Sequence, residues 1–450
     1  MDTWKLTVGM EIHVELETET KLFCGCKNDP FATTPNANVC PVCYGLPGAL
    51  PVINKEAIKM TTRLGRALKG RIASETFWAR KNYFYPDLPK GYQISQSTSP
   101  LVEDAVVVID GENHRIERIH LEEDAGKLTH ASDNKSSLVN LNRAGVPLME
   151  IVTKPDFHSA ADAKRFCQEL QRIIRTLKLS SADMEKGKMR CEANISVSKT
   201  DELGTKVEVK NINSFRAVEK TIEYEMTRQI EALEIGEKID QETRTWSEAK
   251  GKTVVMRKKE TSADYRYFPE PDLPAVRIEL EDEESELLPE EKRSRLVEIG
   301  LTSELIHPVV DRGMFERIEE ISRADKAEAI EAAKLVLAVP AFAEMSLDEQ
   351  LELLSQKRQN GWTKPITEEV VKISVEKKLP VAEVAKDYQA SNDLPELVSA
   401  VIAEQAKAVA DYKAGKEPLF NFLVGQVMAK AQGRANIATV REELAKQLKD

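Results

Sequence analysis

The periodicity of the apolar residues changes once along this 450-residue chain, and that change constrains the fold more than any other feature. Before about residue 280, several segments place an apolar residue at every second position, as half-buried β-strands do. After about residue 285, leucine and alanine recur at helical spacing and the alternation is lost. The sequence therefore predicts an α+β fold in which an antiparallel sheet domain precedes an all-helical region.

The clearest strand pattern spans residues 5–16, where even positions are apolar and Glu11, His13 and Glu15 occupy odd positions. The other strands expected in the N-terminal part are 105–110, 115–122, 191–197 and 205–212, and the helices expected there are 158–178 and 215–233.

The charge-rich segment at 279–296 is typical of a solvated domain boundary. We predict a sheet domain at 1–290, a helical linker domain at 291–364 and a helical tail domain at 365–450. The chain is long enough for several domains, because single hydrophobic cores seldom organise this many residues.

Composition excludes some classes of function. The formal net charge of −11 argues against a protein that coats DNA without sequence specificity, although a local basic groove remains compatible with it. No apolar run is long enough to span a bilayer, and the N-terminus reads as a strand instead of a leader peptide. We expect a cytoplasmic protein with no membrane partner.

Four cysteines form a cluster with the spacing C-x-C-x13-C-x2-C: Cys24, Cys26, Cys40 and Cys43. Short pairs of cysteines on tight turns supply the tetrahedral thiolate ligands that zinc prefers. Four protein ligands leave no open position, so such a zinc would be structural. The alternative is four reduced thiols in a loop.

Carboxylates recur at strand positions in the N-terminal part. Glu11, His13 and Glu15 share one strand face, and "HLEEDAG" ends another strand in three acids. Glu192 and Glu208 stand on predicted strands, and Glu150 and Glu192 stand among apolar residues, where an ionised carboxylate needs a partner. Together they suggest a Mg²⁺ site, because hard cations take oxygen ligands. The alternative is a solvated strand face.

Residues 79–100 combine hydrogen-bond donors with aromatic rings, and Pro86, Pro89 and Gly91 predict a loop. Such a loop suits a phosphate and a stacked base, or it packs back on the core. Its candidate nucleotide-binding residues are Arg80, Lys81, Asn82, Tyr83, Tyr85, Lys90, Gln93, Ser95 and Gln96. The sequence has no phosphate-binding G-x-x-x-x-G-K-[ST] loop, since Trp246 replaces the first glycine, so any ATP site is of an uncommon type.

Eight ordered blocks resemble the B subunits of the tRNA-dependent amidotransferases, the GatB family: "VGMEIHVEL", "RKNYFYPDLPKGYQISQ", "IHLEEDAGK", "LNRAGVPLMEIV", "MRCEANISV", "EVKNINSF", "DYRYFPEPDLP" and "FLVGQVMAKAQGRAN". The resemblance implies a cradle-shaped catalytic domain, a helical region and a YqeY-like helical tail that contacts tRNA. It also implies ATP-dependent phosphorylation of the side-chain carboxylate of Glu-tRNA(Gln) or Asp-tRNA(Asn). Ammonia, which a partner amidase produces from glutamine, then forms the amide, and a small third partner completes a heterotrimer.

The resemblance further implies residue roles. Glu11, His13, Glu123 and Glu150 would be catalytic and bind Mg²⁺, with Glu192 and Glu208 as further metal ligands. Residues 79–96 would line the site for ATP and the tRNA 3′ end, and the cysteine cluster would hold structural zinc. Two alternatives remain: a tRNA-binding scaffold without its own chemistry, and a zinc-dependent interaction module that accounts only for residues 24–43.

Overall fold

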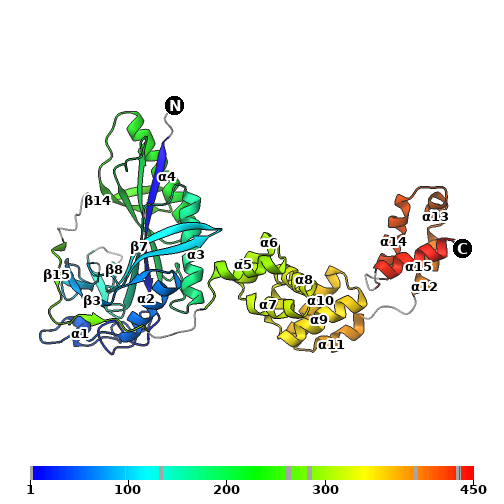
Figure 1. Ribbon diagram of the computed structural model, residues 1–450, viewed down its shortest axis with the longest axis horizontal. Coiled ribbons are helices and arrows are strands. Elements are labelled where there is room, and N and C mark those ends of the chain that lie inside the picture. Colours follow the sequence, from blue (N-terminus) through cyan, green and yellow to red (C-terminus); the bar gives the residue numbers. More distant parts are fainter. Residues whose placement is uncertain are drawn as a thin grey trace. The chain divides into compact units, whose positions relative to one another are not determined.

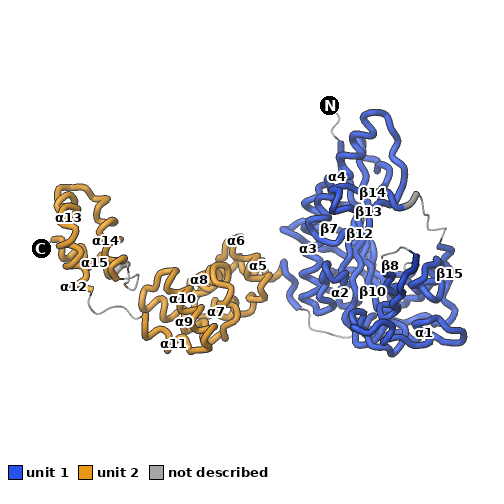
Figure 2. Tube along the Cα trace, turned by 180° about the vertical axis from the view of Figure 1, so that it is seen from behind, with its two compact units in different colours: residues 1–290 blue, residues 291–450 orange. Residues whose placement is uncertain are grey.

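The computed structural model describes residues 4–96, 98–130, 135–258, 265–280, 286–388, 394–431, 435 and 437–449. It contains two compact units, residues 1–290 and 291–450 (Figure 2). All of the described strands lie in the first unit, and the described part of the second is helical (Figure 1). The predicted α+β class is therefore confirmed.

Twelve of the described strands form one sheet. Its main path runs through β14 (Lys252–Lys258), β13 (Glu242–Ser247), β12 (Val207–Ile212), β11 (Met189–Ser198), β1 (Lys5–Glu15), β10 (Pro147–Thr153), β7 (Glu112–Glu123), β5 (Tyr92–Ser95), β4 (Ala79–Asn82) and β15 (Phe268–Pro269). β6 (Val102–Ile109) also pairs with β7, and β2 (Arg71–Ile72) pairs with β6. Two small ribbons join β3 (Glu75–Thr76) to β16 (Val276–Arg277) and β8 (Lys127–His130) to β9 (Ser137–Asn140).

One pairing departs from the antiparallel expectation. β12 and β13 are parallel, and the helix α4 (Phe215–Glu234) connects them. A helix of this length carries the chain back across the sheet, so the next strand enters in the same direction. β13 was missed because its sequence, "ETRTWS", has little apolar content.

Three helices cover one face of the sheet: α2 (Lys55–Ala67), α3 (Ala160–Thr176) and α4. The even-numbered residues of β1, from Leu6 to Val14, are buried in the core that these helices share, as the alternation predicts. The odd-numbered residues, including His13, therefore face the other side of the sheet. Polar residues therefore gather on the face opposite these three helices, which we call the open face.

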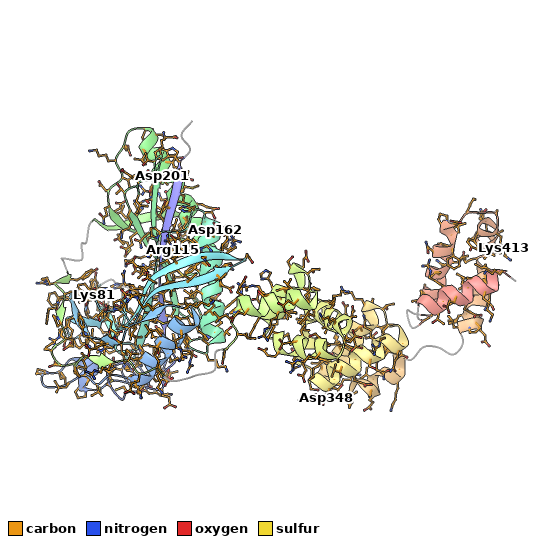
Figure 3. All side chains as sticks on the ribbon, in the orientation of Figure 1. Lys81, Arg115, Asp162, Asp201, Asp348 and Lys413 are labelled. Atoms are coloured by element: carbon orange, nitrogen blue, oxygen red, sulfur yellow. The ribbon has the colours of Figure 1, made fainter. Side chains whose placement is uncertain are left out.

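The second unit consists of α5 (Pro289–Ile299), α6 (Ser303–Asp311), α7 (Phe315–Ala324), α8 (Lys326–Ala338), η2 (Pro340–Glu344), α9 (Leu347–Asn360), α10 (Lys364–Lys377), α11 (Val381–Val384), η3 (Ala385–Tyr388), α12 (Leu394–Glu404), α13 (Ala406–Lys413), α14 (Pro418–Lys430) and α15 (Ile437–Lys449). Charged side chains such as Asp348 and Lys413 lie on its surface (Figure 3). No helix in the described ranges is long and apolar enough to cross a membrane.

The predicted boundary at 364/365 falls at the first residue of α10, and α10 packs against α9, α11 and η2. A separate apolar cluster joins α12, α14 and α15, with Val398, Leu423 and Leu444 at its centre. The division of the helical half into 291–364 and 365–450 stays a prediction.

A buried ion network fastens α4 to the parallel edge of the sheet. The side chain of Glu225 is fully buried and accepts hydrogen bonds from Arg228 at 2.7 Å and from the Thr253 hydroxyl. Arg244 of β13 lies 3.2 Å from the same carboxylate. Burial by itself would raise the pKa of Glu225, but the hydrogen bonds from Arg228 and Thr253 outweigh it and hold the pKa below 4.5.

We expect Glu225→Gln to lower the free energy of unfolding by about 3 kcal/mol at neutral pH, because it removes a fully buried charge and leaves the partly buried Arg228 and Arg244 without their counter-charge. Because the folded pKa is depressed, the ionised carboxylate stabilises the fold above the unfolded pKa. That contribution is lost as the pH falls through the folded pKa. The difference between wild type and variant should therefore be full near pH 7 and shrink below about pH 4.5. Denaturant unfolding at several pH values measures this difference in the free energy of unfolding.

Glu223→Gln, on the exposed side of α4, is the matched control. An equal effect of the two variants would contradict the argument.

Candidate active site

The register of four central strands sets charged residues side by side on the open face of the sheet. Arg190 of β11 is paired with His13 of β1, His13 with Glu150 of β10, and Glu150 with His120 of β7. Paired residues in neighbouring strands point to the same face, so their side chains meet across the sheet. One row of backbone pairs thus brings two imidazoles and a carboxylate together from three distant parts of the sequence.

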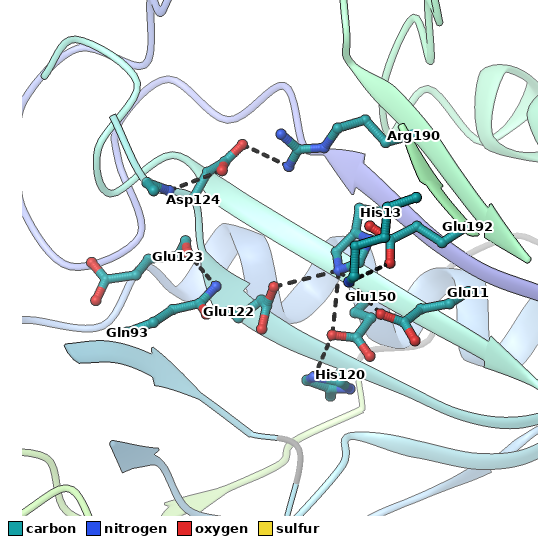
Figure 4. Close-up of polar contacts among 12 residues, drawn as sticks. Glu11, His13, Gln93, His120, Glu122, Glu123, Asp124, Glu150, Arg190 and Glu192 are labelled. Carbon is teal, nitrogen blue, oxygen red and sulfur yellow. Dashed lines mark hydrogen bonds and ion pairs between the residues drawn. The ribbon is translucent and has the colours of Figure 1, made fainter. Parts of the chain in front are cut away.

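His13 is the centre of this cluster (Figure 4). Its Nε2 lies 3.4 Å from Glu150 Oε2, 3.6 Å from Glu122 Oε1 and 4.0 Å from Glu11 Oε1. Burial would by itself lower the pKa of His13, but the hydrogen bond to Glu150 and the surrounding carboxylates raise it to about 9. The imidazole is therefore protonated at neutral pH and balances part of the negative charge.

His120 is fully buried, and neither of its ring nitrogens has a hydrogen-bond partner among the described residues. Its Nε2 lies 3.4 Å from Glu150 Oε2, a contact that lacks hydrogen-bond geometry. Glu122 Oε2 is likewise buried without a hydrogen-bond partner in the described structure. Buried polar atoms of this kind are rare, and a bound cation would satisfy them.

Ligand atoms converge at three overlapping points in this region. The groups are Glu11, His13 and Glu150; His120, Glu122 and Glu150; and Glu11, Glu192 and Glu208, and within each the ligand atoms lie within 4.8 Å of one another. Burial, and after it the charges of Glu150 and Glu192, raise the pKa of Glu11 to about 7. The pKa of Glu150 is held well below its usual value: burial opposes this, but the two histidines outweigh it. Carboxylates under such mutual repulsion are suited to a cation.

The third group already contains a positive charge. Lys210 Nζ lies 2.7 Å from Glu192 Oε2 and 3.1 Å from Glu208 Oε1. A metal ion that used both carboxylates would have to displace this ammonium group. The structure therefore brings the predicted residues Glu192 and Glu208 together with Glu11, but with a lysine between them.

Glu123 in "HLEEDAG" was predicted to bind the metal ion, and that role stays a prediction, but the structure gives Glu123 and Glu122 different partners. The alternation separates Glu123 from Glu122 as expected, but it is Glu122 that faces His13. Glu123 pairs with Lys90 and accepts a hydrogen bond from the backbone N–H of Ile94 at 3.0 Å. Glu123 lies two residues after Leu121 on the same strand, so both side chains point to the same face of the sheet. Leu121 is buried in the core, and the side chain of Glu123 therefore does not point to the open face.

Two residues of the cluster were missed from the sequence, His120 and Glu122. The strand alternation could have identified them. His120, Glu122 and Asp124 are at even positions, whereas the apolar residues Ile119 and Leu121 are at odd positions and point to the opposite face.

The 79–100 segment was predicted to be a loop. In the structure, β4 and β5 pair as a hairpin, and residues 83–91 connect the two strands. Among the predicted nucleotide-binding residues, Lys81 is under the electrostatic influence of the cluster: burial would lower its pKa, but the charges of Glu122, Tyr267 and Glu150 raise it. Its ammonium group also lies 5.0 Å from the centre of the Tyr265 ring.

The other predicted residues of this hairpin make internal contacts or are exposed. Arg80 forms a paired hydrogen bond with Glu270 at 2.8 Å, and Asn82 donates to the backbone carbonyls of Tyr265 and Arg266. The hydroxyl of Tyr83 donates to Gln93 at 3.3 Å, and Gln93 donates to the backbone carbonyl of Glu123. Lys90 forms an ion pair with Glu123. Ser95 and Gln96 are buried, and Tyr85 is exposed. These contacts position the hairpin against the acidic cluster.

The four cysteines do converge. Cys43 Sγ lies 3.6 Å from Cys24, 3.8 Å from Cys40 and 3.9 Å from Cys26. Four sulfurs at about 2.3 Å from one zinc ion would be about 3.8 Å apart, so the spacing fits tetrahedral coordination. The hydrogen bond from the Cys24 thiol, helped by the charge of buried Lys21, lowers the pKa of Cys43 to about 4. The cluster can hold a metal ion that prefers thiolates.

The cysteine cluster also supports the hairpin. Its second pair lies at the short helix α1 (Pro41–Tyr44), which Gly45 ends in a left-handed conformation at φ +64°. A Cβ at Gly45 would come within 2.5 Å of the Lys90 side chain, so glycine is required by both the turn and the close approach. Lys90 in turn binds Glu123.

Comparisons with known proteins place this geometry in context. Residues 6–284 match the model of the GatB/GatE catalytic domain family, and residues 323–448 match the model of the GatB domain. The chain is 42% identical to the B subunit of the aspartyl/glutamyl-tRNA(Asn/Gln) amidotransferase of Carboxydothermus hydrogenoformans over 484 aligned positions, which cover 99% of the chain and 100% of that protein. It is 40% identical to the B subunit of the chloroplastic/mitochondrial glutamyl-tRNA(Gln) amidotransferase of Physcomitrium patens, covering 97% of the chain and 84% of that protein.

We expect the purified chain to contain one tightly bound, thiolate-ligated metal ion per molecule, measured by inductively coupled plasma mass spectrometry. Cys26→Ser should lose the ion and lower the midpoint of thermal unfolding, because the loop between the cysteine pairs then loses its cross-link. Cys167→Ala, at a buried cysteine of the sheet domain core, is the control and should keep the metal. The assignment would be refuted if the purified wild-type protein contained no metal and its melting temperature did not change on addition of a chelator.

Proposed function

The chain belongs to the GatB family of tRNA-dependent amidotransferase B subunits, and from this premise we propose that its acidic cluster phosphorylates and then amidates the side chain of misacylated tRNA. The substrates would be Glu-tRNA(Gln), Asp-tRNA(Asn) or both. The single observation that carries the proposal is the convergence of Glu11, Glu122 and Glu150 around His13 on the open face of the sheet.

The chemistry explains why such a site is needed. A carboxylate is a poor acyl donor because oxide is a poor leaving group. Transfer of the γ-phosphoryl group of ATP to a side-chain oxygen gives an acyl phosphate and ADP. Ammonia then attacks the acyl carbon, the phosphate leaves, and the nitrogen loses a proton to form the amide. The first step brings together two anions, which repel one another.

The residues present fit a magnesium ion. Glu11, Glu122 and Glu150 offer carboxylate oxygens, which Mg²⁺ prefers, and the unpartnered atoms of Glu122 and His120 indicate an unmet need for a ligand. When bound, the ion would neutralise the charge of ATP and of the substrate carboxylate. It would also lower the pKa of His13, since one positive charge disfavours another nearby. Glu192 and Glu208 would serve a second ion only after Lys210 moves.

The β4–β5 hairpin supports binding of ATP and the tRNA 3′ end beside the acids. Lys81 supplies a cation whose charge interacts with those of Glu122 and Glu150, and such a cation would attract a phosphate oxygen. Tyr83 lies edge-to-face with Tyr85 and with Tyr265, and the Phe84 ring is 78% exposed. Exposed aromatic faces of this kind stack on nucleobases.

As a member of this family, the chain works with other protein subunits and with tRNA. We propose two protein partners in a heterotrimer: an amidase, which releases ammonia from glutamine, and a small third protein. The helical tail would contact the body of the tRNA. We further propose that the cysteine cluster holds zinc in a structural role, because all four positions of the tetrahedron are filled by protein sulfur.

Glu122→Gln should reduce tRNA-dependent amidation on the order of a hundredfold, because it removes charge that holds the metal ion. The assay uses the complex reconstituted with the amidase and the small third protein, Glu-tRNA(Gln), labelled ATP and ammonium. It follows label on the aminoacyl group and formation of Gln-tRNA(Gln). Glu117→Gln, an exposed position on the same strand, should keep full activity. If Glu122→Gln were fully active, the chain would be a tRNA-binding scaffold, and catalysis would lie in its partners.

A further inference from the structure

An irregularity in the sheet brings Lys210 of β12 to the acidic residues. The register between β11 and β12 shifts by one residue beside Glu192, so that Lys210 and Asn211 lie opposite Glu192 alone. Asn211 has a left-handed conformation at φ +59°, which asparagine adopts more readily than most residues. A β-bulge of this kind redirects the side chains next to it and is common beside active sites. The position of Lys210 is therefore built into the backbone.

The ammonium group of Lys210 is held by carboxylates. Its Nζ donates to Glu192 Oε2 at 2.7 Å and lies 3.1 Å from Glu208 Oε1. The Thr243 hydroxyl donates to the other oxygen of Glu208 at 2.8 Å. Burial would lower the pKa of Lys210, but the charges of these two acids and of Glu11 raise it, so the group stays an ammonium ion. It thus occupies the point at which three carboxylates converge.

A divalent cation and this ammonium group compete for the same oxygens. Mg²⁺ holds its oxygen ligands at about 2.1 Å, and two cations bound to the same carboxylates would repel each other. The lysine is the partner that can leave, because its side chain is 26% exposed and has a long, flexible stem. Glu208, in contrast, is tied to the neighbouring strand by Thr243. A cation that enters at this point therefore exchanges with Lys210.

A displaced ammonium group needs another anion, because an unpaired charge is costly in a partly buried site. The proposed nucleotide supplies one, since lysine binds phosphate as a point charge. The charge of a second lysine, Lys81 on β4, interacts with those of Glu122 and Glu150. In the sheet, β12 and β4 lie on opposite sides of the acid-bearing strands β11, β1, β10 and β7. A phosphate chain above the acids would therefore have a lysine on each side.

We propose that Lys210 exchanges partners when the nucleotide binds: it neutralises Glu192 and Glu208 beforehand, and then moves to a phosphate group while a divalent cation takes its place. This inference rests on the proposed function. Lys210 is a positioning residue in this scheme, because it controls when the third group of ligands can accept an ion. The second ion and the nucleotide would thus favour each other's binding, and the acids would stay neutralised until both arrive.

The first measurement counts divalent ions in the absence of nucleotide. Mn²⁺ is the probe, because it takes the same oxygen ligands as Mg²⁺ and its free concentration is read by electron paramagnetic resonance. In the reconstituted complex, Lys210→Met should raise the affinity for the second Mn²⁺ about ten- to a hundredfold, the usual effect of one adjacent charge on an ionisable group. The affinity for the first Mn²⁺ should change much less.

The second measurement follows binding of a non-hydrolysable ATP analogue at saturating Mg²⁺, where the second ion is in place in every variant. Lys210→Met should weaken this binding about tenfold, because a phosphate loses a hydrogen bond between charged groups. One substitution is thus expected to strengthen binding of the metal and to weaken binding of the nucleotide. A residue that only supports the fold would not give opposite effects.

Three further variants serve as controls. Lys210→Arg keeps the positive charge and should stay close to the wild type in both measurements. Lys210→Gln removes the charge with a different side chain and should repeat both effects, so the test does not depend on assembly of the methionine variant. Lys252→Met removes an exposed lysine of β14, which changes the net charge equally, and should alter neither affinity.

The other outcomes overturn the proposal. An unchanged affinity for the second Mn²⁺ would show that the ammonium group does not compete with the ion. An unchanged affinity for the ATP analogue would show that Lys210 does not pass to a phosphate, and losses in both measurements would leave it a structural role. Neither measurement uses tRNA. The proposed function would fail separately, if a wild-type complex that binds both ions and the nucleotide transferred no phosphoryl group to the aminoacyl side chain.

Discussion

The register of the central strands is the constraint on which the candidate site depends. His13, Glu150 and His120 meet only because β1, β10 and β7 pair antiparallel at those residues. A slip of one residue would turn each carboxylate toward the helices and each apolar neighbour toward the open face. The apolar core beneath the sheet prevents that slip, since Met10, Ile12 and Ile151 are fully buried on the opposite side. Core packing thus holds together charges that repel one another.

Two sets of contacts support the β4–β5 hairpin at the edge of this sheet. Toward the cysteine cluster, Gly45 lets α1 approach Lys90, and Lys90 binds Glu123 at the end of β7. Toward β15, Arg80 binds Glu270 beside the pairing of β4 and β15. Arg80 and Lys90, which the sequence predicts as nucleotide-binding residues, thus also make contacts within the protein that place the hairpin. The charge of Lys81 interacts with those of the acids.

Alternation in the sequence was informative about faces but not about partners. It placed Glu11 and His13 on one face of β1 and separated Glu122 from Glu123, and both statements hold in the structure. It did not say which face of β7 is the open one, because "HLEEDAG" contains acids of both parities. The sequence did not predict the parallel pairing of β12 and β13 for a related reason: the polar residues of β13 give no periodic signal.

The sequence by itself determined the α+β class, the change to helices near residue 285, the cysteine cluster and most of the acids, because each is written in spacing along the chain. Its eight blocks also determined the family, which the comparisons confirm. Only the tertiary structure decided that Glu122 and His120 join His13 and that Lys210 stands between Glu192 and Glu208. Those facts depend on which strands become neighbours and in which register. They follow from long-range packing, which local spacing does not encode.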